Sequence, residues 1–213
     1  MDLELNNIIP EFLEKEKIEH SEIWGRKLQL KQGEKIHVIA PSGSGKTSLV
    51  HFLYGLRKDF TGDIILNNSP IKSFTPSRYA EMRSREMSII FQELRLFPDH
   101  TAYQNIAVKR SLCPYHKSEK IHEMADRLGI KSKLNQVTRQ CSFGEQQRIA
   151  IIRSLQQPFS MLLMDEPFSN LDENNRKKAM ELIMEESNLR QASVILFDLN
   201  KIEYFKNDSL LYL

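Results

Sequence analysis

Ala40-Pro41-Ser42-Gly43-Ser44-Gly45-Lys46-Thr47 is the stretch that decides the fold. It follows an apolar run at Lys35–Ile39 that predicts a buried strand, and it leads into a predicted helix over residues 47–56. Strand, glycine-rich turn and helix in this order are typical of a phosphate-binding loop. The first position holds alanine where the usual pattern has glycine, a small residue that still lets the chain turn tightly. The alternative, a glycine-rich turn that binds nothing, does not explain the Gly-Lys-Thr ending.

The chemistry of such a loop predicts a nucleoside triphosphate ligand. Successive backbone N–H groups and the positive end of the helix attract phosphate oxygens, Lys46 reaches the terminal phosphates, and Thr47 can hold Mg²⁺. The residues of this segment expected to contact the nucleotide are Ser42, Gly43, Ser44, Gly45, Lys46, Thr47 and Ser48.

The bulk composition excludes several classes of protein. A length of 213 residues fits one sizeable core, so we expect a single domain over 1–213. The 30 basic and 28 acidic residues give a net charge of +2, which provides no electrostatic argument for nucleic acid. Cys113 and Cys141 have neither metal-ligand nor disulfide spacing. The first ten residues contain several polar side chains where a signal peptide would have an apolar block. We therefore expect a cytoplasmic protein whose membrane role would come through a partner.

The hydrophobic pattern predicts an α/β fold. Strands alternate with helices, which implies a P-loop core with a mostly parallel sheet covered on both faces. An antiparallel β-subdomain near the N-terminus and a helical subdomain over about 93–157 complete the expected architecture. The charged stretch 11–20 is expected to be a solvated loop or the end of a hairpin. Strands are expected at 3–9, 23–30, 62–68, 87–91, 161–164, 194–197 and 209–213, and helices at 47–56, 79–85, 148–155, 176–188 and within 101–135.

Two adjacent carboxylates, Asp165 and Glu166, directly follow the apolar run at 161–164. The carboxyl ends of parallel strands are where such sheets bind ligands, and the phosphate loop opens at the same edge. Asp165 is expected to orient Mg²⁺, and Glu166 is expected to act as general base on the attacking water. The alternative is a solvated carboxylate pair before the turn at Pro167.

These motifs together resemble the ATP-binding subunit of an ABC transporter over nearly the whole chain. Phe91-Gln92-Glu93 resembles the Q-loop, 141–148 (Cys-Ser-Phe-Gly-Glu-Gln-Gln-Arg) resembles the LSGGEQQR signature, Met161 to Glu166 resembles the Walker B strand, and Ser169-Asn170-Leu171-Asp172 resembles the D-loop. The segment 83–105 is most similar to the subgroup that serves lipoprotein-release, macrolide-export and cell-division permeases.

The resemblance implies a composite site built by two subunits. Each ATP would lie between the phosphate loop of one subunit and the signature of a second subunit, whose Ser142 and Gly144 would contact the γ-phosphate. Gln92 would sense the nucleotide and, with Thr47 and Asp165, contribute to the Mg²⁺ site. The implied partners are a second cassette subunit, a homodimer being expected, and an integral membrane permease on whose inner face the protein would sit. No nucleic acid is expected.

Several positions depart from the family pattern. Leu199 stands where the family has a histidine that contacts the γ-phosphate, and a leucine cannot donate a hydrogen bond to phosphate or water. In the signature, Cys141 replaces leucine and Phe143 replaces the first glycine. Phe12 is the expected adenine-stacking aromatic and Trp24 the less favoured candidate, with packing in the core or an interface as the alternative for either.

The function expected from the sequence is an ATPase that powers or gates a membrane permease. The alternative from another class is a regulatory module that dimerises on ATP with little hydrolysis. Glu166, Asp165 and Gln92 favour the first function, whereas Leu199 and Phe143 favour the second. A soluble ATPase of DNA repair or translation is disfavoured because there is no long coiled coil, tandem cassette or basic patch.

Overall fold

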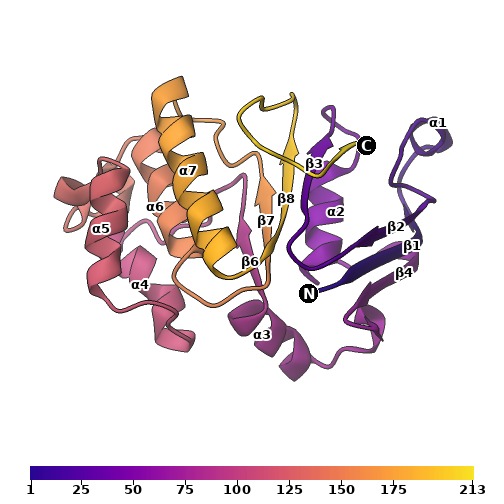
Figure 1. The fold of residues 1–213 in the computed structure, drawn as a ribbon, viewed down its shortest axis with the longest axis horizontal. Helices are drawn as coiled ribbons and strands as arrows, with labels where there is room; N and C mark the ends of the chain where they lie inside the picture. The colour runs from indigo at the N-terminus through magenta and orange to yellow at the C-terminus, as the bar shows by residue number, and fades with distance from the viewer.

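A parallel sheet forms the centre of the computed structural model, which describes residues 1–213 (Figure 1). Its five strands lie in the order β6-β7-β8-β3-β9, and every neighbouring pair is parallel. Their side chains are mostly buried on both faces, which is the pattern of a sheet covered by helices on each side. The strands are β3 (Lys35–Ile39), β6 (Met87–Ile90), β7 (Met161–Asp165), β8 (Ser193–Asp198) and β9 (Ser209–Tyr212).

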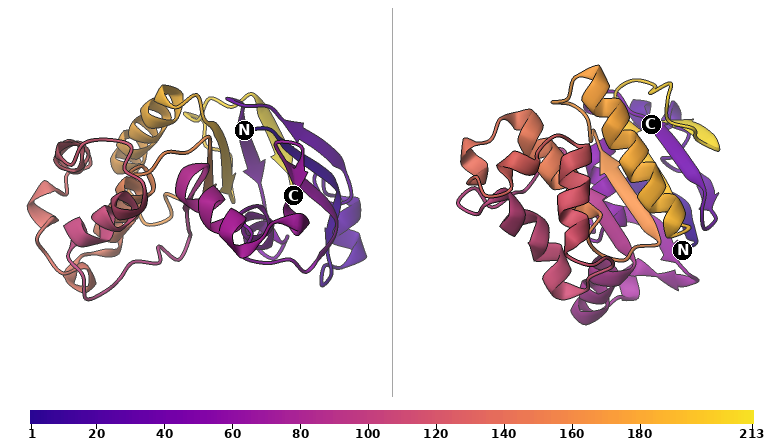
Figure 2. Two further views of the ribbon diagram at one scale, coloured as in Figure 1. Left: turned by 90° about the horizontal axis from the view of Figure 1, so that it is seen from below. Right: turned by 60° about the vertical axis from the view of Figure 1, so that its left-hand side comes forward.

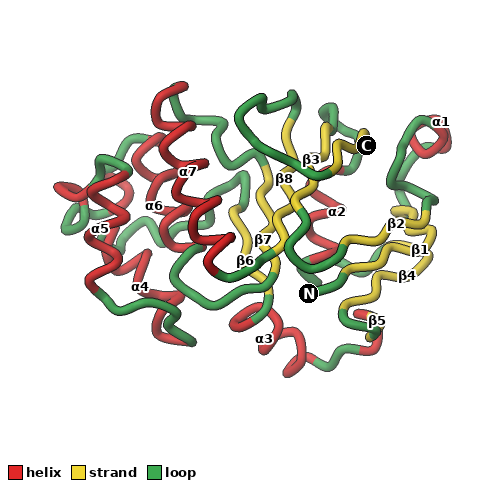
Figure 3. Tube along the Cα trace, viewed as in Figure 1, coloured by secondary structure: helices red, strands yellow, loops and turns green.

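A second, antiparallel sheet packs beside the first near the N-terminus (Figure 3). Its order is β2-β1-β4-β5, with β1 at Leu3–Pro10, β2 at Lys27–Leu30, β4 at Phe60–Leu66 and β5 at Ser69–Pro70. The strand predicted over 23–30 begins only at Lys27, so that boundary was wrong. The Ser21 hydroxyl accepts hydrogen bonds from the backbone N–H groups of Ile23 and Trp24 at 3.0 and 2.9 Å, and this turn takes both residues out of the sheet.

Some helices flank the parallel sheet, and others gather at one end of the molecule. Helices α2 and α7 lie on opposite faces of the sheet, and α4, α5 and α6 gather at the end away from the antiparallel sheet (Figures 1 and 2). The α-helices are α1 (Lys15–Glu19), α2 (Lys46–Leu53), α3 (Pro76–Arg85), α4 (Ala102–Leu112), α5 (Glu119–Arg127), α6 (Phe143–Ser154) and α7 (Glu173–Leu189). Short 3₁₀ turns occur at Ile71–Ser73, Lys131–Lys133 and Thr138–Gln140. No helix is both long and apolar enough to span a bilayer.

Helix boundaries differ from the sequence expectation where polar caps act. The stretch 11–20 is not all loop, because it contains α1. Helix α6 starts five residues before the expected 148, because the Ser142 hydroxyl accepts from the Glu145 N–H while the Glu145 carboxylate accepts from the Ser142 N–H. Helix α7 starts at Glu173 because the Asp172 carboxylate accepts from the Asn175 N–H, without the reciprocal bond. The predicted α/β architecture with its mostly parallel sheet is confirmed.

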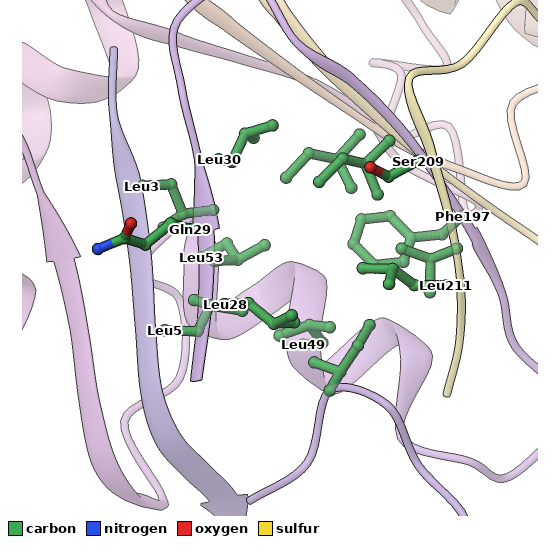
Figure 4. A pocket seen from close by; sticks show the side chains of 14 residues that line it. Leu3, Leu5, Leu28, Gln29, Leu30, Leu49, Leu53, Phe197, Ser209 and Leu211 are labelled. Atoms are coloured by element: carbon green, nitrogen blue, oxygen red, sulfur yellow. The ribbon is translucent and has the colours of Figure 1, made fainter. Parts of the chain in front are cut away.

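Two hydrophobic clusters fill the interior. One lies between the two sheets and α2, and the other joins α4 to α7 with β7 and β8. A cavity of about 100 Å³ remains in the first cluster, lined almost entirely by apolar side chains that include Leu49, Phe197 and Leu211 (Figure 4). This packing holds the carboxyl ends of β3, β7 and β8 at one edge of the sheet, where the candidate site forms.

Candidate functional site

The phosphate-binding loop connects β3 to α2 in a backbone shape that needs glycine. Gly43 and Gly45 have φ values of 76° and 93°, which ordinary side chains rarely adopt. A Cβ on Gly45 would also lie 3.0 Å from the ring of Trp24. The indole N–H of Trp24 donates to the Ser44 carbonyl at 3.0 Å, and only 1% of this side chain is exposed. Trp24 therefore supports the loop from below, and the suggestion that it stacks on adenine was wrong.

The loop presents hydrogen-bond donors that have no partner within the protein. The backbone N–H groups of Gly45, Lys46, Thr47 and Ser48 donate to no backbone or side-chain oxygen, as the start of a helix leaves them free. The Ser44 hydroxyl is buried and also lacks a partner. Since buried polar groups are normally paired, this set of donors fits an anion such as a phosphate.

An open groove of about 310 Å³ runs along the loop. Phe12 lies among its lining residues, as do Gln92 and Glu166, so the groove brings together residues from four separate parts of the chain. The loop residues in its lining are Pro41, Ser42, Gly43, Gly45, Lys46, Thr47 and Ser48. A lining that combines an aromatic ring with the phosphate-binding loop suits a ligand that has an aromatic base and phosphates.

The two carboxylates at the carboxyl end of β7, Asp165 and Glu166, face the loop lysine. The Lys46 ammonium forms an ion pair with Glu166 and lies 3.9 Å from Oδ1 of Asp165. The Thr47 hydroxyl donates to Oδ2 of Asp165 at 3.1 Å. Burial raises the pKa of Asp165, opposed by Lys46 and Thr47, and burial lowers the pKa of Lys46. The Lys46 ammonium thus lies against both acids of the site.

A divalent cation fits beside Asp165. Its Oδ1 atom is buried and accepts no hydrogen bond, which leaves a lone pair free for a metal. Gln92, exposed in the segment after β6, lines a small hollow of about 140 Å³ together with Thr47 and Asp165. Hydroxyl, amide and carboxylate oxygens are the donors that Mg²⁺ prefers.

Phe12 lies in the segment after β1 with 51% of its surface exposed. The guanidinium carbon of Arg57 lies 4.8 Å from the centre of its ring, and Arg57 also donates to the Ser48 hydroxyl at 3.1 Å. An ion pair with Asp59 holds Arg57 from another direction. Arg57 is absent from the groove lining, so it supports the ring from outside the groove. Nothing in the sequence pattern singles out this arginine.

The signature residues stand apart from this groove. Ser142 caps α6, Phe143 is 72% exposed, and Gly144 follows in the first turn. Neither Ser142 nor Gly144 lines the groove of its own chain. The phenylalanine ring therefore points into solvent and leaves the cap geometry of the helix unchanged.

Leu199 comes directly after β8, at the same sheet edge as the loop and the acids. The β8 register pairs Asp198 with Ile39 and Phe197 with Asp165, which fixes this placement. The Leu199 side chain is 43% exposed. Oδ1 of Asp198 accepts from the N–H groups of Leu199 and Asn200 at 2.8 and 3.4 Å. Asp198 thus caps its own loop and does not replace the missing histidine.

Comparison with known proteins gives consistent matches. The family model described as ABC transporter matches residues 25–169. The lipoprotein-releasing system ATP-binding protein LolD of Legionella pneumophila (strain Lens) is 34% identical over 164 residues, which cover 76% of this chain and 72% of that protein. The LolD protein of Saccharophagus degradans is 32% identical over 175 residues, covering 81% and 77%.

Solved structures with the same fold include a dimeric form of MJ0796, a bacterial ABC transporter cassette. It superposes with a TM-score of 0.80 at 22% identity, covering 93% of this chain and 88% of that chain. A second dimeric structure of that cassette, in a post-hydrolysis state bound to ADP and Pi, gives a TM-score of 0.79 at 22% identity over the same share of each chain.

Proposed function

The chain belongs to the ABC transporter family and is an ATP-binding, ATP-hydrolysing subunit of it, and on this premise we propose which of its residues carry each step. The observation that supports the assignment is the convergence of Lys46, Thr47, Asp165 and Glu166 at one sheet edge, beside a row of unpaired backbone donors. The adenine base would stack on Phe12, backed by Arg57, and the triphosphate would follow the loop toward Glu166.

Glu166 is the general base, and its contact with Lys46 makes its activity depend on the substrate. In this structure the Lys46 ammonium forms an ion pair with the Glu166 carboxylate. A triphosphate offers Lys46 several negative oxygens, so the ammonium transfers to the phosphates. Glu166 is then free to accept a proton from the attacking water.

Thr47, Asp165 and Gln92 would hold Mg²⁺ through their oxygens. When bound, the ion supplies positive charge that neutralises the phosphate oxygens during phosphoryl transfer. The unpaired Oδ1 of Asp165 supports this assignment. Residues of the phosphate loop would hold the substrate in position. Gln92, on the exposed segment after β6, would sense the bound phosphate and transmit its presence to the protein surface.

The second half of the site would come from another copy of this chain. Ser142 and Gly144 do not line their own groove, and the positive start of α6 is exposed in front of them, as an intermolecular phosphate contact requires. Dimers would form on ATP and open after hydrolysis, because the shared phosphate contacts exist only in the closed state. An integral membrane permease of the kind served by the lipoprotein-releasing relatives would receive this motion at the inner face of the membrane, and that permease would determine what is transported.

ATP turnover of the purified chain tests this function directly. We expect the wild-type chain to hydrolyse ATP, Lys46→Ala to lose both binding and turnover, and Lys58→Ala, an exposed lysine away from the groove, to behave as wild type. Purification from the native membrane should bring a permease with the chain and raise its turnover. A wild-type chain that neither binds nor hydrolyses ATP would overturn the proposal, and turnover that the permease leaves unchanged would favour the regulatory module.

A further inference from the structure

A buried glutamine connects the signature helix to the loop that carries Glu166. Gln147, one turn into α6, has no exposed surface. Its amide nitrogen donates to the Glu166 carbonyl at 3.3 Å, and its amide oxygen accepts from the Asn170 N–H at 2.9 Å. A buried amide is unfavourable unless both ends are paired, and here each end is paired with backbone of the same loop.

The same loop touches α6 a second time, nearer the signature. A Cβ on Gly144 would lie 3.0 Å from the Asn170 carbonyl oxygen, so only glycine allows the helix and loop to approach this closely without a shift. The two contacts are one helical turn apart on α6. They hold the first turns of the helix against residues 166–170 as one unit.

The geometry of Glu166 needs such support. Its φ is 44°, in the left-handed region that costs a side chain of this kind on the order of 1 kcal/mol or more. Its N–H donates to the Phe197 carbonyl at 3.0 Å, and Gln147 holds its carbonyl from the other side. The backbone that aims the Glu166 carboxylate is therefore fixed jointly by β8 and by α6.

We propose that Gln147 is a positioning residue that couples the two ATP sites of the dimer, by linking the signature turn, which faces the partner's nucleotide, to the base of its own site. This inference rests on the function proposed above. A phosphate bound across the interface by Ser142 and Gly144 shifts the start of α6, and Gln147 passes that shift to the backbone of Glu166. Each site then becomes active only when the other is occupied.

The test compares Gln147→Met with Gln157→Met in the full-length chain. Both glutamines are fully buried in or after α6, and Gln157 donates to the carbonyls of Arg83 and Met87, far from the loop. Methionine is of similar size and keeps the packing while removing the amide. The measurements are kcat, the Hill coefficient for ATP, the affinity for ADP, which needs one half-site only, and the melting temperature.

We expect Gln147→Met to lower kcat about tenfold and the Hill coefficient to about 1, while the affinity for ADP stays within about twofold of wild type. Gln157→Met is expected to change the melting temperature alone. Equal kcat losses in both variants would show that Gln147 acts only through packing. An unchanged kcat and Hill coefficient in Gln147→Met would refute the coupling. If Gln147→Met does not fold, Gln147→Glu, which keeps the acceptor for Asn170 and loses the donor to Glu166, is expected to give the same kinetic change.

The control for the underlying function is the wild-type chain in the same assays. Wild-type protein without ATP turnover would overturn both the proposed function and this inference. Wild-type turnover with unaltered kinetics in the Gln147 variants would overturn the coupling alone. The two failures are therefore distinguishable.

Discussion

The phosphate-loop half of the site and the signature half differ in how closely they follow their family. In the first half, Lys46, Thr47, Asp165 and Glu166 are all present, in contact, and supported from below by Trp24. In the second half, Cys141 and Phe143 replace family residues, and the side chain of Phe143 faces solvent. A third replacement, Leu199, lies after β8 at the sheet edge of the first half. From this difference we expect nucleotide binding to rest on residues that follow the family pattern, and the rate of turnover to depend on positions that depart from it.

The largest expected effect concerns the intact half. Glu166→Gln keeps the size and position of the side chain and removes the base, so ATP turnover should fall at least about a hundredfold while ATP binding is retained. Steady-state phosphate release and equilibrium binding measure the two quantities. Glu181→Gln on the exposed face of α7 is the control. An unchanged rate would show that Glu166 is not the base.

A smaller effect is expected from the half that faces the partner. Ser142→Ala removes a hydroxyl that would bind phosphate across the interface, so the ATP concentration needed for dimerisation should rise about tenfold, a loss of roughly 1.4 kcal/mol. The substitution also removes a helix cap. Thr101→Ala removes an equivalent capping box from α4 and isolates that contribution. Equal effects of the two substitutions on dimerisation would argue against the phosphate contact.

Restoring the histidine that the family has at position 199 should raise turnover. Leu199→His places a hydrogen-bond donor after β8 and is expected to raise turnover about tenfold, since a hydrogen bond to a charged group contributes roughly 1.5 kcal/mol. Leu189→His, at an exposed leucine near the opposite edge of the sheet, should leave the rate unchanged. A lower or unchanged rate in Leu199→His would mean that the site is organised around another group.

The smallest effect concerns the base-binding end of the groove. Arg57→Gln removes the cation from the outer face of Phe12, and cation–π contacts of this kind contribute roughly 0.5 to 1 kcal/mol. The affinity for ATP should therefore fall about two- to fivefold, with kcat unchanged, in a fluorescence titration. The neighbouring Lys58→Gln is the control. Equal affinity for ATP in wild type and Arg57→Gln would show that Arg57 does not contribute to base binding through Phe12.

The sequence was most informative where function constrains the backbone directly. Glycine spacing and apolar runs have few structural solutions. The sequence therefore predicted the phosphate-binding loop, the strands that lead to it, the position of the two acids at the end of β7, and the family. Long-range contacts were not predicted. Trp24 was the less favoured stacking candidate, and no local pattern reveals that its indole N–H bonds to the Ser44 carbonyl. Nor does any local pattern reveal that Gln147 bonds to Glu166 and Asn170.

Caps explain most of the boundary errors. Helix α6 begins at the signature because Ser142 and Glu145 cap it reciprocally, a pair that apolar periodicity does not detect. The late start of β2 has the same kind of cause, since the Ser21 hydroxyl accepts from the backbone N–H groups of Ile23 and Trp24. Polar side chains that act on nearby backbone thus account for what hydrophobic patterns miss.

The association state of Glu166→Gln in ATP and in ADP tests the central claim most directly, namely that the intact half binds ATP and the altered half still closes on it. Sedimentation velocity with Mg²⁺ present should show dimers in ATP and monomers in ADP. Introducing Lys46→Ala as a second substitution in the same chain should abolish the ATP-dependent dimer. A chain that remains monomeric in saturating ATP would contradict the account, because Ser142 and Gly144 would then have no phosphate to meet.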